Sequence, residues 1–91
     1  PRLVRLRNYR LDALPVGAIL IVENEDQPGV IGAIGTLLGE VGINVSRAQV
    51  GLDPAQKIAL MLWNIDSPAP EPTLARIRKL PNLRSCVQVT L

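Results

Sequence analysis

The residues best suited to bind a small molecule fall in one short stretch, NEDQPGVIG, which begins at Asn24. Asn24 offers both a donor and an acceptor, and Asp26 offers an acceptor that carries a charge. Pro28 and Gly29 stand where an apolar helix is predicted to begin, and the free N–H groups of a first helical turn attract carboxylate or phosphate. Asn44 adds a further amide just after that helix. Such a mixture of groups suits a zwitterion, for example a free amino acid.

The same residues have a plainer interpretation as helix signals. Asp26 or Gln27 can accept the free N–H groups of the first turn as a helix cap, which contributes about 1 kcal/mol without any ligand. Pro28 fits the first turn, where its missing N–H costs nothing. Asn44 alone can be an ordinary residue at the start of a strand. Spacing by itself therefore leaves capping and ligand binding as open alternatives.

The helix that would carry this site is predicted to run from Pro28 to about Val41. Its apolar residues fall within an arc of about 120° on a helical wheel, the width of a stripe that faces a core. Gly42 follows as a C-terminal glycine. A second strip, away from the core, consists of glycines that together cost roughly 3 kcal/mol relative to alanine. We expect another backbone to approach this strip, from the second helix or from a paired subunit. The apolar stripe is Val30, Ile31, Ile34, Leu37, Leu38 and Val41, and the glycine strip is Gly32, Gly35 and Gly39.

Strands are predicted on both sides of this helix. AILIV and KIALMLWNID are apolar on both alternating faces, as strands covered on both sides would be. INVSRAQVGL joins KIALMLWNID through a short link, Asp53 to Gln56, which predicts an antiparallel hairpin. A short second helix ends at Pro81, and the last strand has one apolar face. The predicted strands are residues 18–22, 43–52, 57–66 and 83–91; the second helix carries Leu74, Ile77 and Leu80, and the last strand's apolar face is Leu83, Val87, Val89 and Leu91.

This order predicts an α+β fold of the ferredoxin-like βαββαβ type, an antiparallel four-stranded sheet with two helices on one face. An extension of residues 1–16, with one or two short strands, precedes the domain at 17–91. Two helices cover only one face of the sheet, yet two strands are apolar on both. We therefore expect the other face to meet a second copy, which makes the protein at least a dimer.

Composition excludes several classes of function. The chain has 91 residues, enough for one small domain, and its net charge of +2 owes much to arginines in the extension. The remaining charges are nearly balanced, which argues against a nucleic-acid surface. No histidine is present, and Cys86 is the only cysteine, so zinc sites, disulfides and the usual catalytic sets are not expected. We expect no enzyme activity in this chain. The arginines are Arg2, Arg5, Arg7 and Arg10.

Compartment and nucleic-acid binding can also be addressed from the sequence. A single cysteine fits a reducing cytoplasm, and no apolar run approaches the roughly 20 residues of a membrane span. VIGAIGTLL superficially matches the loop of KH nucleic-acid-binding domains, but Ala33 and Ile34 stand inside that loop and the helical stripe continues through it. An RNA-recognition motif shares the element order, but the expected sheet lacks its stacking aromatics. Both nucleic-acid readings are disfavoured.

The stretch ENEDQPGVIGAIGTLLGEVGINVSRAQVG, which starts at Glu23 and contains the candidate site, resembles the signature of ACT domains. The resemblance is strongest to the C-terminal ACT domains of D-3-phosphoglycerate dehydrogenases, and it continues through IALMLWNID to VQVTL. It implies a regulatory module of serine biosynthesis that binds L-serine or another small amino acid where two ACT domains pair. It also implies a catalytic domain elsewhere that binds NAD, with no cofactor in this chain.

The resemblance also assigns roles to single residues. Asn24 stands where this family often has His or Tyr, and Asp26 matches the next ligand position. Asn44 matches an asparagine that is contributed across the pair. A module that only dimerises, without a ligand, is the alternative. The expected ligand-binding set is Asn24, Asp26, Gln27, Pro28, Gly29, Val30, Ile31 and Asn44, in which Pro28 and Gly29 expose the helix amides and Val30 and Ile31 wall the pocket.

Overall fold

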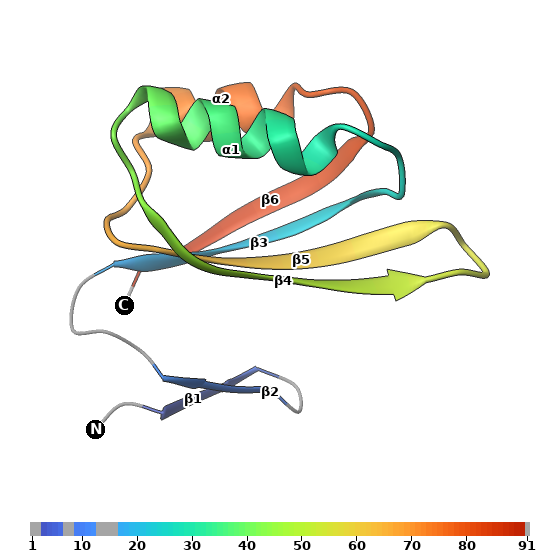
Figure 1. Cartoon of the computed structure of the whole chain (residues 1–91), viewed down its shortest axis with the longest axis horizontal. Helices are drawn as coiled ribbons and strands as arrows, with labels where there is room; N and C mark the ends of the chain where they lie inside the picture. Colours follow the sequence, from blue (N-terminus) through green and yellow to red (C-terminus); the bar gives the residue numbers. More distant parts are fainter. Residues whose placement is uncertain (1–2, 7–8, 13–16, 91) are drawn as a thin grey trace.

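The computed structural model describes the backbone of residues 3–6, 9–12 and 17–90, and the side chains of residues 17–90. Residues 17–90 fold in the order βαββαβ (Figure 1), so the predicted ferredoxin-like α+β fold is confirmed. The element bounds are β3 Ala18–Glu25, α1 Val30–Glu40, β4 Val45–Asp53, β5 Ile58–Ile65, α2 Glu71–Arg78 and β6 Leu83–Thr90.

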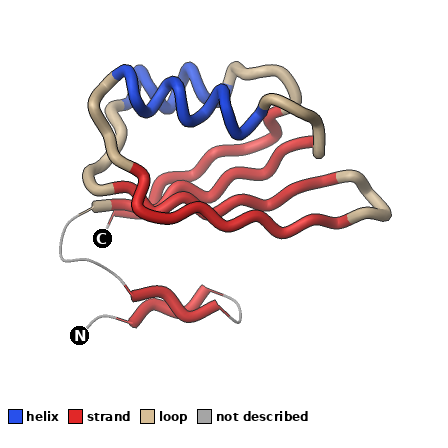
Figure 2. The backbone as a smooth tube through the Cα atoms, in the orientation of Figure 1, coloured by secondary structure: helices blue, strands red, loops and turns tan. Residues whose placement is uncertain are grey.

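The sheet has the strand order β4-β5-β3-β6, and every neighbouring pair is antiparallel. Both helices lie in one layer over one face of this sheet (Figure 2). The opposite face is the open face. β4 and β6 are the edge strands, so each has one side without a partner strand in the described chain. An unpaired strand edge carries free N–H and C=O groups that can pair with another chain.

The predicted extension contains two short strands, β1 (Leu3–Leu6) and β2 (Tyr9–Asp12). They pair antiparallel as a separate two-stranded sheet. The rest of the predicted extension, residues 1–2, 7–8 and 13–16, lies outside the described residues.

The main core lies between the helices and the sheet. Four residues of the predicted stripe on α1 are buried there: Val30, Ile34, Leu37 and Leu38. The stripe was wrong for two residues, because Ile31 is 53% exposed and Val41 is 45% exposed. Ile31 lies at the edge of the predicted arc, and Val41 lies beyond the last helical residue, where it no longer follows the helical period.

The start of α1 differs from the prediction. The helix begins at Val30, and its N-cap is Gly29 in the left-handed conformation, with φ of 93°. Pro28 therefore precedes the cap instead of occupying the first turn. No side chain caps the helix, so capping by Asp26 or Gln27 was wrong. The predicted end is confirmed, because the Gly42 N–H donates to the Gly39 carbonyl at 3.0 Å and Gly42 has a φ of 73°.

The glycine strip of α1, Gly32, Gly35 and Gly39, faces empty space in the described chain. A Cβ atom added at any of the three would have no heavy atom within 4 Å, apart from the helix's own backbone and chain neighbours. The second helix is therefore not the backbone that approaches this strip, and that half of the prediction was wrong. Approach by a paired subunit stays a prediction.

The open face of the sheet carries several apolar side chains, as its sequence predicted, together with polar residues such as Glu23 and Ser85. Ile19 and Leu62 are buried there, although they do not belong to the main core. Of the apolar face predicted for the last strand, Val87 and Val89 lie here, 54% and 43% exposed. Leu83 was placed wrongly, because the register with β3 shifts between Glu23 and Asn24 and Leu83 packs against the main core; Leu91 lies outside the described residues. Cys86 of β6 is buried in the main core. Contact of the open face with a second copy stays a prediction.

Candidate functional site

The last part of β3 positions Asn24. The strand does not stop at Val22 as predicted but continues to Glu25, because Asn24 and Glu25 still pair with Ala59 and Ile58 of β5. Alternate residues of β3 face the helices. Asn24 follows this alternation, so its polar side chain lies under the helical layer and is only 3% exposed.

The hydrogen bonds of Asn24 leave one buried acceptor free. Its Nδ2 donates to the Glu25 carbonyl at 2.8 Å, which fixes the orientation of the carboxamide. Its Oδ1 is buried and has no hydrogen-bond partner in the described chain. A buried acceptor without a donor costs about 1–3 kcal/mol. Such an orphan at the end of a strand marks a place where a ligand could supply the missing donor.

The two residues after Asn24 are held by the neighbouring turns. The Glu25 N–H donates to the Asn82 carbonyl at 2.8 Å, and the Asp26 N–H donates to the Lys57 carbonyl at 2.8 Å. The Asp26 side chain is exposed, and no hydrogen bond or ion pair of its carboxylate is found among the described residues. Its backbone is therefore fixed while its charge is free for an external partner.

The start of α1 offers uncapped amides. The first N–H that bonds back to the turn is that of Ala33, which donates to the Gly29 carbonyl at 3.0 Å. The preceding N–H groups of the first turn have no side-chain acceptor. Val30 is buried beneath the turn, and Ile31 lies at its surface. A cleft of about 220 Å³ adjoins this turn. It is lined by Pro28, Gly29, Val30, Ala33, Leu80, Pro81 and Asn82.

Asn44 lies at the other end of the sheet. It is exposed, and its backbone N–H and its Nδ2 donate to the Asp66 carboxylate at 3.2 and 3.3 Å. Val45, the next residue, is level with Ala18 of β3, whereas Asn24 is level with Leu52 of β4. At about 3.3 Å per strand residue, the two ends are roughly 20 Å apart. Of the predicted site residues, Asn44 is thus far from the rest, which are consecutive in the chain from Asn24 to Ile31. Pro28, Gly29 and Val30 line the cleft at the start of α1, whereas Asn24, Asp26, Gln27 and Ile31 are not among its lining residues.

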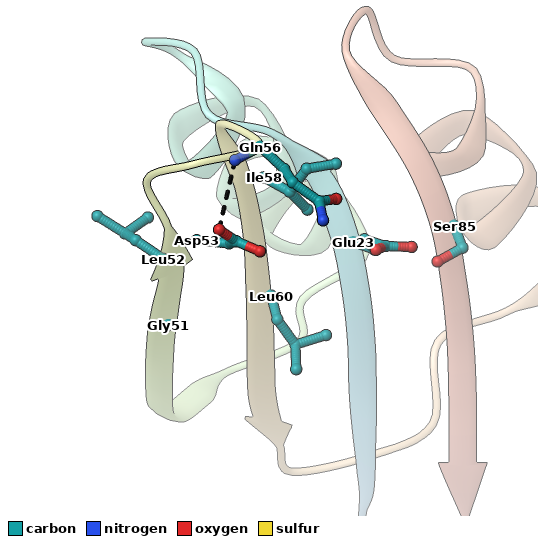
Figure 3. Close-up of a pocket in the computed structure, with 8 residues that line it drawn as sticks. All are labelled: Glu23, Gly51, Leu52, Asp53, Gln56, Ile58, Leu60 and Ser85. Atoms are coloured by element: carbon teal, nitrogen blue, oxygen red, sulfur yellow. Dashed lines mark hydrogen bonds between the residues drawn. The ribbon is translucent and has the colours of Figure 1, made fainter.

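A larger hollow, of about 430 Å³, lies at the open face and not beside α1. Figure 3 shows Glu23 and Ser85 pointing toward one another on this face. The Asp53 carboxylate accepts the N–H groups of Ala55 and Gln56 at 3.1 and 3.3 Å, so it serves the turn between β4 and β5. Buried side-chain oxygens without a partner among the described residues also occur at Gln49 and Asn64. We take the smaller end-of-strand site as the candidate because its unpartnered oxygen, on Asn24, is followed directly by the uncapped start of α1. The hollow is lined by Glu23, Gly51, Leu52, Asp53, Gln56, Ile58, Leu60 and Ser85.

Two contributors to the site were missed from the sequence, Lys57 and Asn82, because they act through backbone carbonyls. Asn82 had a usable signal, since asparagine tolerates a positive φ and this one follows a proline. Lys57 had none. Among the described residues there is no group of three or more side chains that could hold a metal ion, and neither described helix is long and apolar enough to cross a membrane.

Residues 18–82 match the family model of the ACT domain. The chain belongs to the ACT domain family. The match runs from the first residue of β3 to Asn82, the last residue before β6, and it includes every predicted ligand residue. The predicted division into an extension at residues 1–16 and a domain at residues 17–91 is not tested by this match and stays a prediction.

The curated relatives of this ACT domain are much longer proteins. It is 31% identical over 91 residues to D-3-phosphoglycerate dehydrogenase of Methanocaldococcus jannaschii, and the match covers 100% of this chain and 17% of that protein. It is 35% identical over 92 residues to D-3-phosphoglycerate dehydrogenase of Archaeoglobus fulgidus, covering 99% and 18%. The chain thus spans about a sixth of these relatives, and it corresponds to their C-terminal region.

Solved structures show the same fold. An ACT domain protein from Streptococcus pneumoniae superimposes with a TM-score of 0.64 at 15% identity, covering 82% of this chain and 89% of that chain. At this level of identity the likeness concerns the fold alone.

Proposed function

We propose that this ACT domain is a regulatory module that binds L-serine, or another small amino acid, where two copies pair. The bound amino acid would control a phosphoglycerate dehydrogenase whose catalytic domain, with its NAD, lies outside this chain. Similarity to the C-terminal regions of D-3-phosphoglycerate dehydrogenases supports the choice of enzyme. Serine is chosen because the resemblance of the stretch around Asp26 to the ACT signature implies it. The proposal places no catalytic residue and no cofactor in the ACT domain itself.

The observation that carries this proposal is the buried, unpartnered Oδ1 of Asn24. It stands at the end of β3, from which the loop leads directly to the uncapped start of α1. Asn24 and Asp26 both present acceptors, and the first turn of α1 presents donors. An amino acid matches this order of groups, because its ammonium donates to the first two and its carboxylate accepts from the helix.

The position of Asn44 supports a shared site. β4 is an edge strand, and antiparallel pairing of two β4 strands about a two-fold axis is the simplest way to continue the sheet. Such pairing reverses the direction of the second strand. The second copy's Asn44 would then lie at the end of the sheet that holds Asn24 and Asp26. Asn44, which lies far from the site within one chain, would therefore be supplied to the site by the second copy.

Exposed apolar side chains support the same edge as the interface. The helix-side residues of β4 are not covered by α1, and Leu52 is 60% exposed while Val50 is 46% exposed. Ile31 and the glycine strip add an uncovered flank of α1. Burial of this surface favours association by about 25 cal/mol for each Å² of apolar area.

Control would follow from the pairing itself. An amino acid that contacts both copies binds the paired state more tightly than the separate state, so it shifts the population toward the pair. Catalytic domains attached to the two copies would then be held in one arrangement. We also propose the cytoplasm as the compartment, on the ground that the single cysteine, Cys86, is buried and unpaired.

Isothermal titration calorimetry tests this function. L-serine, glycine and L-alanine are titrated into the parent chain, into Asp26→Ala and into Glu23→Ala. We expect serine to bind the parent and Glu23→Ala alike, because Glu23 is an exposed acid on the open face. Binding to Asp26→Ala should be weaker by about tenfold or more, the effect of losing a charge-assisted hydrogen bond. Absence of heat with every amino acid at millimolar concentration would favour a module that only dimerises.

A further inference from the structure

Two residues of the described chain, apart from glycines, have a positive φ. Lys57 has a φ of 57° and Asn82 has a φ of 71°. Each immediately precedes a strand: Lys57 leads into β5 and Asn82 leads into β6. β5 and β6 are the two neighbours of β3 in the sheet. The two left-handed residues therefore flank the exit of β3 from both sides.

The carbonyls of both residues accept hydrogen bonds from that exit. The Lys57 carbonyl accepts from the Asp26 N–H and the Asn82 carbonyl accepts from the Glu25 N–H, each at 2.8 Å. The Glu25 carbonyl in turn accepts from Asn24 Nδ2 at 2.8 Å. These three hydrogen bonds thus fix the backbone of Glu25 and Asp26 to the two turns and fix the Asn24 carboxamide to the Glu25 carbonyl.

The left-handed conformation of Lys57 is unfavourable by itself. Asparagine adopts a positive φ more readily than most residues, but a long side chain such as lysine rarely does, because its Cβ approaches the following carbonyl. Strain of this kind persists where the surrounding structure requires it, and it concentrates at ligand sites. Relaxation of Lys57 to a negative φ would rotate its peptide and withdraw the carbonyl from the Asp26 N–H.

We infer that Lys57 and Asn82 are positioning residues of the amino-acid site. Their backbone carbonyls hold Glu25 and Asp26 where the Asp26 carboxylate and the Asn24 carboxamide can meet one ammonium group. Neither side chain needs to touch the ligand. This inference rests on the proposed function for the ligand, but the clamp on Asp26 exists without a ligand and can be measured alone.

A pair of variants with the same loss of charge tests the inference. Lys57→Gly adopts the positive φ freely, whereas Lys57→Val strongly resists it because its side chain is β-branched. Amide hydrogen exchange reports the clamp, with the Asp26 N–H compared to the Val22 N–H in the middle of β3. Calorimetry with L-serine reports the site.

We expect Lys57→Val to raise the exchange rate of the Asp26 amide while the Val22 amide stays protected, and to weaken serine binding by about tenfold. Lys57→Gly should keep both values near those of the parent. Equal weakening by Gly and Val would overturn the inference, because the lysine side chain would then be the cause. Unchanged Asp26 protection in a folded Lys57→Val would overturn it as well.

A second pair covers the case in which Lys57→Val does not fold. Asn82→Gly and Asn82→Val are compared in the same way through the Glu25 amide. The two failures remain distinct: a parent chain that binds no amino acid contradicts the proposed function. In that case the exchange data alone test whether Lys57 and Asn82 hold Asp26 and Glu25. The positioning role is upheld if the Val variant loses amide protection and the Gly variant keeps it, and it is overturned by any other result.

Discussion

Asn24 and Asn44 of one chain lie at opposite ends of the same sheet. Asn24 is level with Leu52 of β4, and Asn44 precedes Val45 at the far end of that strand. A single copy therefore cannot bring the two carboxamides to one small ligand. If both contact the same amino acid, the site belongs to a pair of chains, and binding and association are linked.

Replacing Asn24 by leucine tests whether this residue contributes to ligand binding or to the stability of the fold. The change removes an unpartnered buried oxygen, but it also removes the Nδ2 donor to the Glu25 carbonyl. These two effects oppose each other, so we expect the free energy of unfolding to change by no more than about 1 kcal/mol. Binding of L-serine should be lost. Urea denaturation measures the stability and calorimetry measures the binding. A folded variant that still binds serine would contradict the role given to Asn24.

A charged substitution on β4 tests whether the edge of this strand is the interface between two copies. Leu52→Glu introduces a carboxylate into the proposed interface, where a second copy would have to bury it, so we expect sedimentation velocity to show monomers. Val87→Glu tests the other interface, since Val87 is similarly exposed but lies on the open face of β6, where the sequence predicted contact with a second copy. If the pair forms through β4, this variant should remain a dimer. Dissociation caused by Val87→Glu and not by Leu52→Glu would move the interface to the open face.

Gly35 tests the glycine strip. Nothing surrounds its Cβ position in the described chain, so Gly35→Ala should stabilise the monomer by about 1 kcal/mol through helix propensity. Gly35→Leu should also fold, but it should weaken dimerisation because its side chain would hold the second copy away. Thermal unfolding and sedimentation equilibrium measure these outcomes. A leucine variant that dimerises and binds like the parent would show that no backbone approaches the strip.

Cys86 gives the domain a pH dependence at alkaline pH. Burial raises the pKa of its thiol, and the Arg78 guanidinium opposes this more weakly. Because the folded pKa lies above the unfolded value of about 8.5, the unfolded state loses its proton first. The stabilising contribution is therefore complete below about pH 8.5 and is lost as pH rises through the folded pKa. Denaturation of the parent and of Cys86→Ala at several pH values isolates this effect. Parallel curves for the two proteins would refute it.

Much of the fold could be predicted from the sequence because its signals are local. The apolar period of α1, the glycine at its end and the turn residues between β4 and β5 each act within a few residues. The boundaries around the site could not be predicted so well. β3 extends to Glu25 because the pairing with β5 continues, and this pairing depends on residues more than thirty positions away.

Residue types alone indicated the candidate site, but not the burial or the hydrogen bonding of its residues. The sequence stretch around Asp26 indicated binding, yet a cap and a ligand site use the same residues, and only the uncapped start of α1 separates them. Burial of Asn24 depends on the helical layer above it. The contribution of Lys57 is a backbone carbonyl in a strained turn, for which a lysine gives no sequence signal.

Mixed dimers test the shared site most directly. Asp26→Ala and Asn44→Ala each damage both sites of their own homodimer, whereas a mixed dimer has one intact site and one that lacks both residues. After unfolding and refolding of an equal mixture, statistical pairing should restore about a quarter of the parental serine sites with parental affinity, because contacts across a two-fold axis are reciprocal. Calorimetry counts these sites. No recovery in the mixture, or full binding by either single variant alone, would contradict a site shared between two copies.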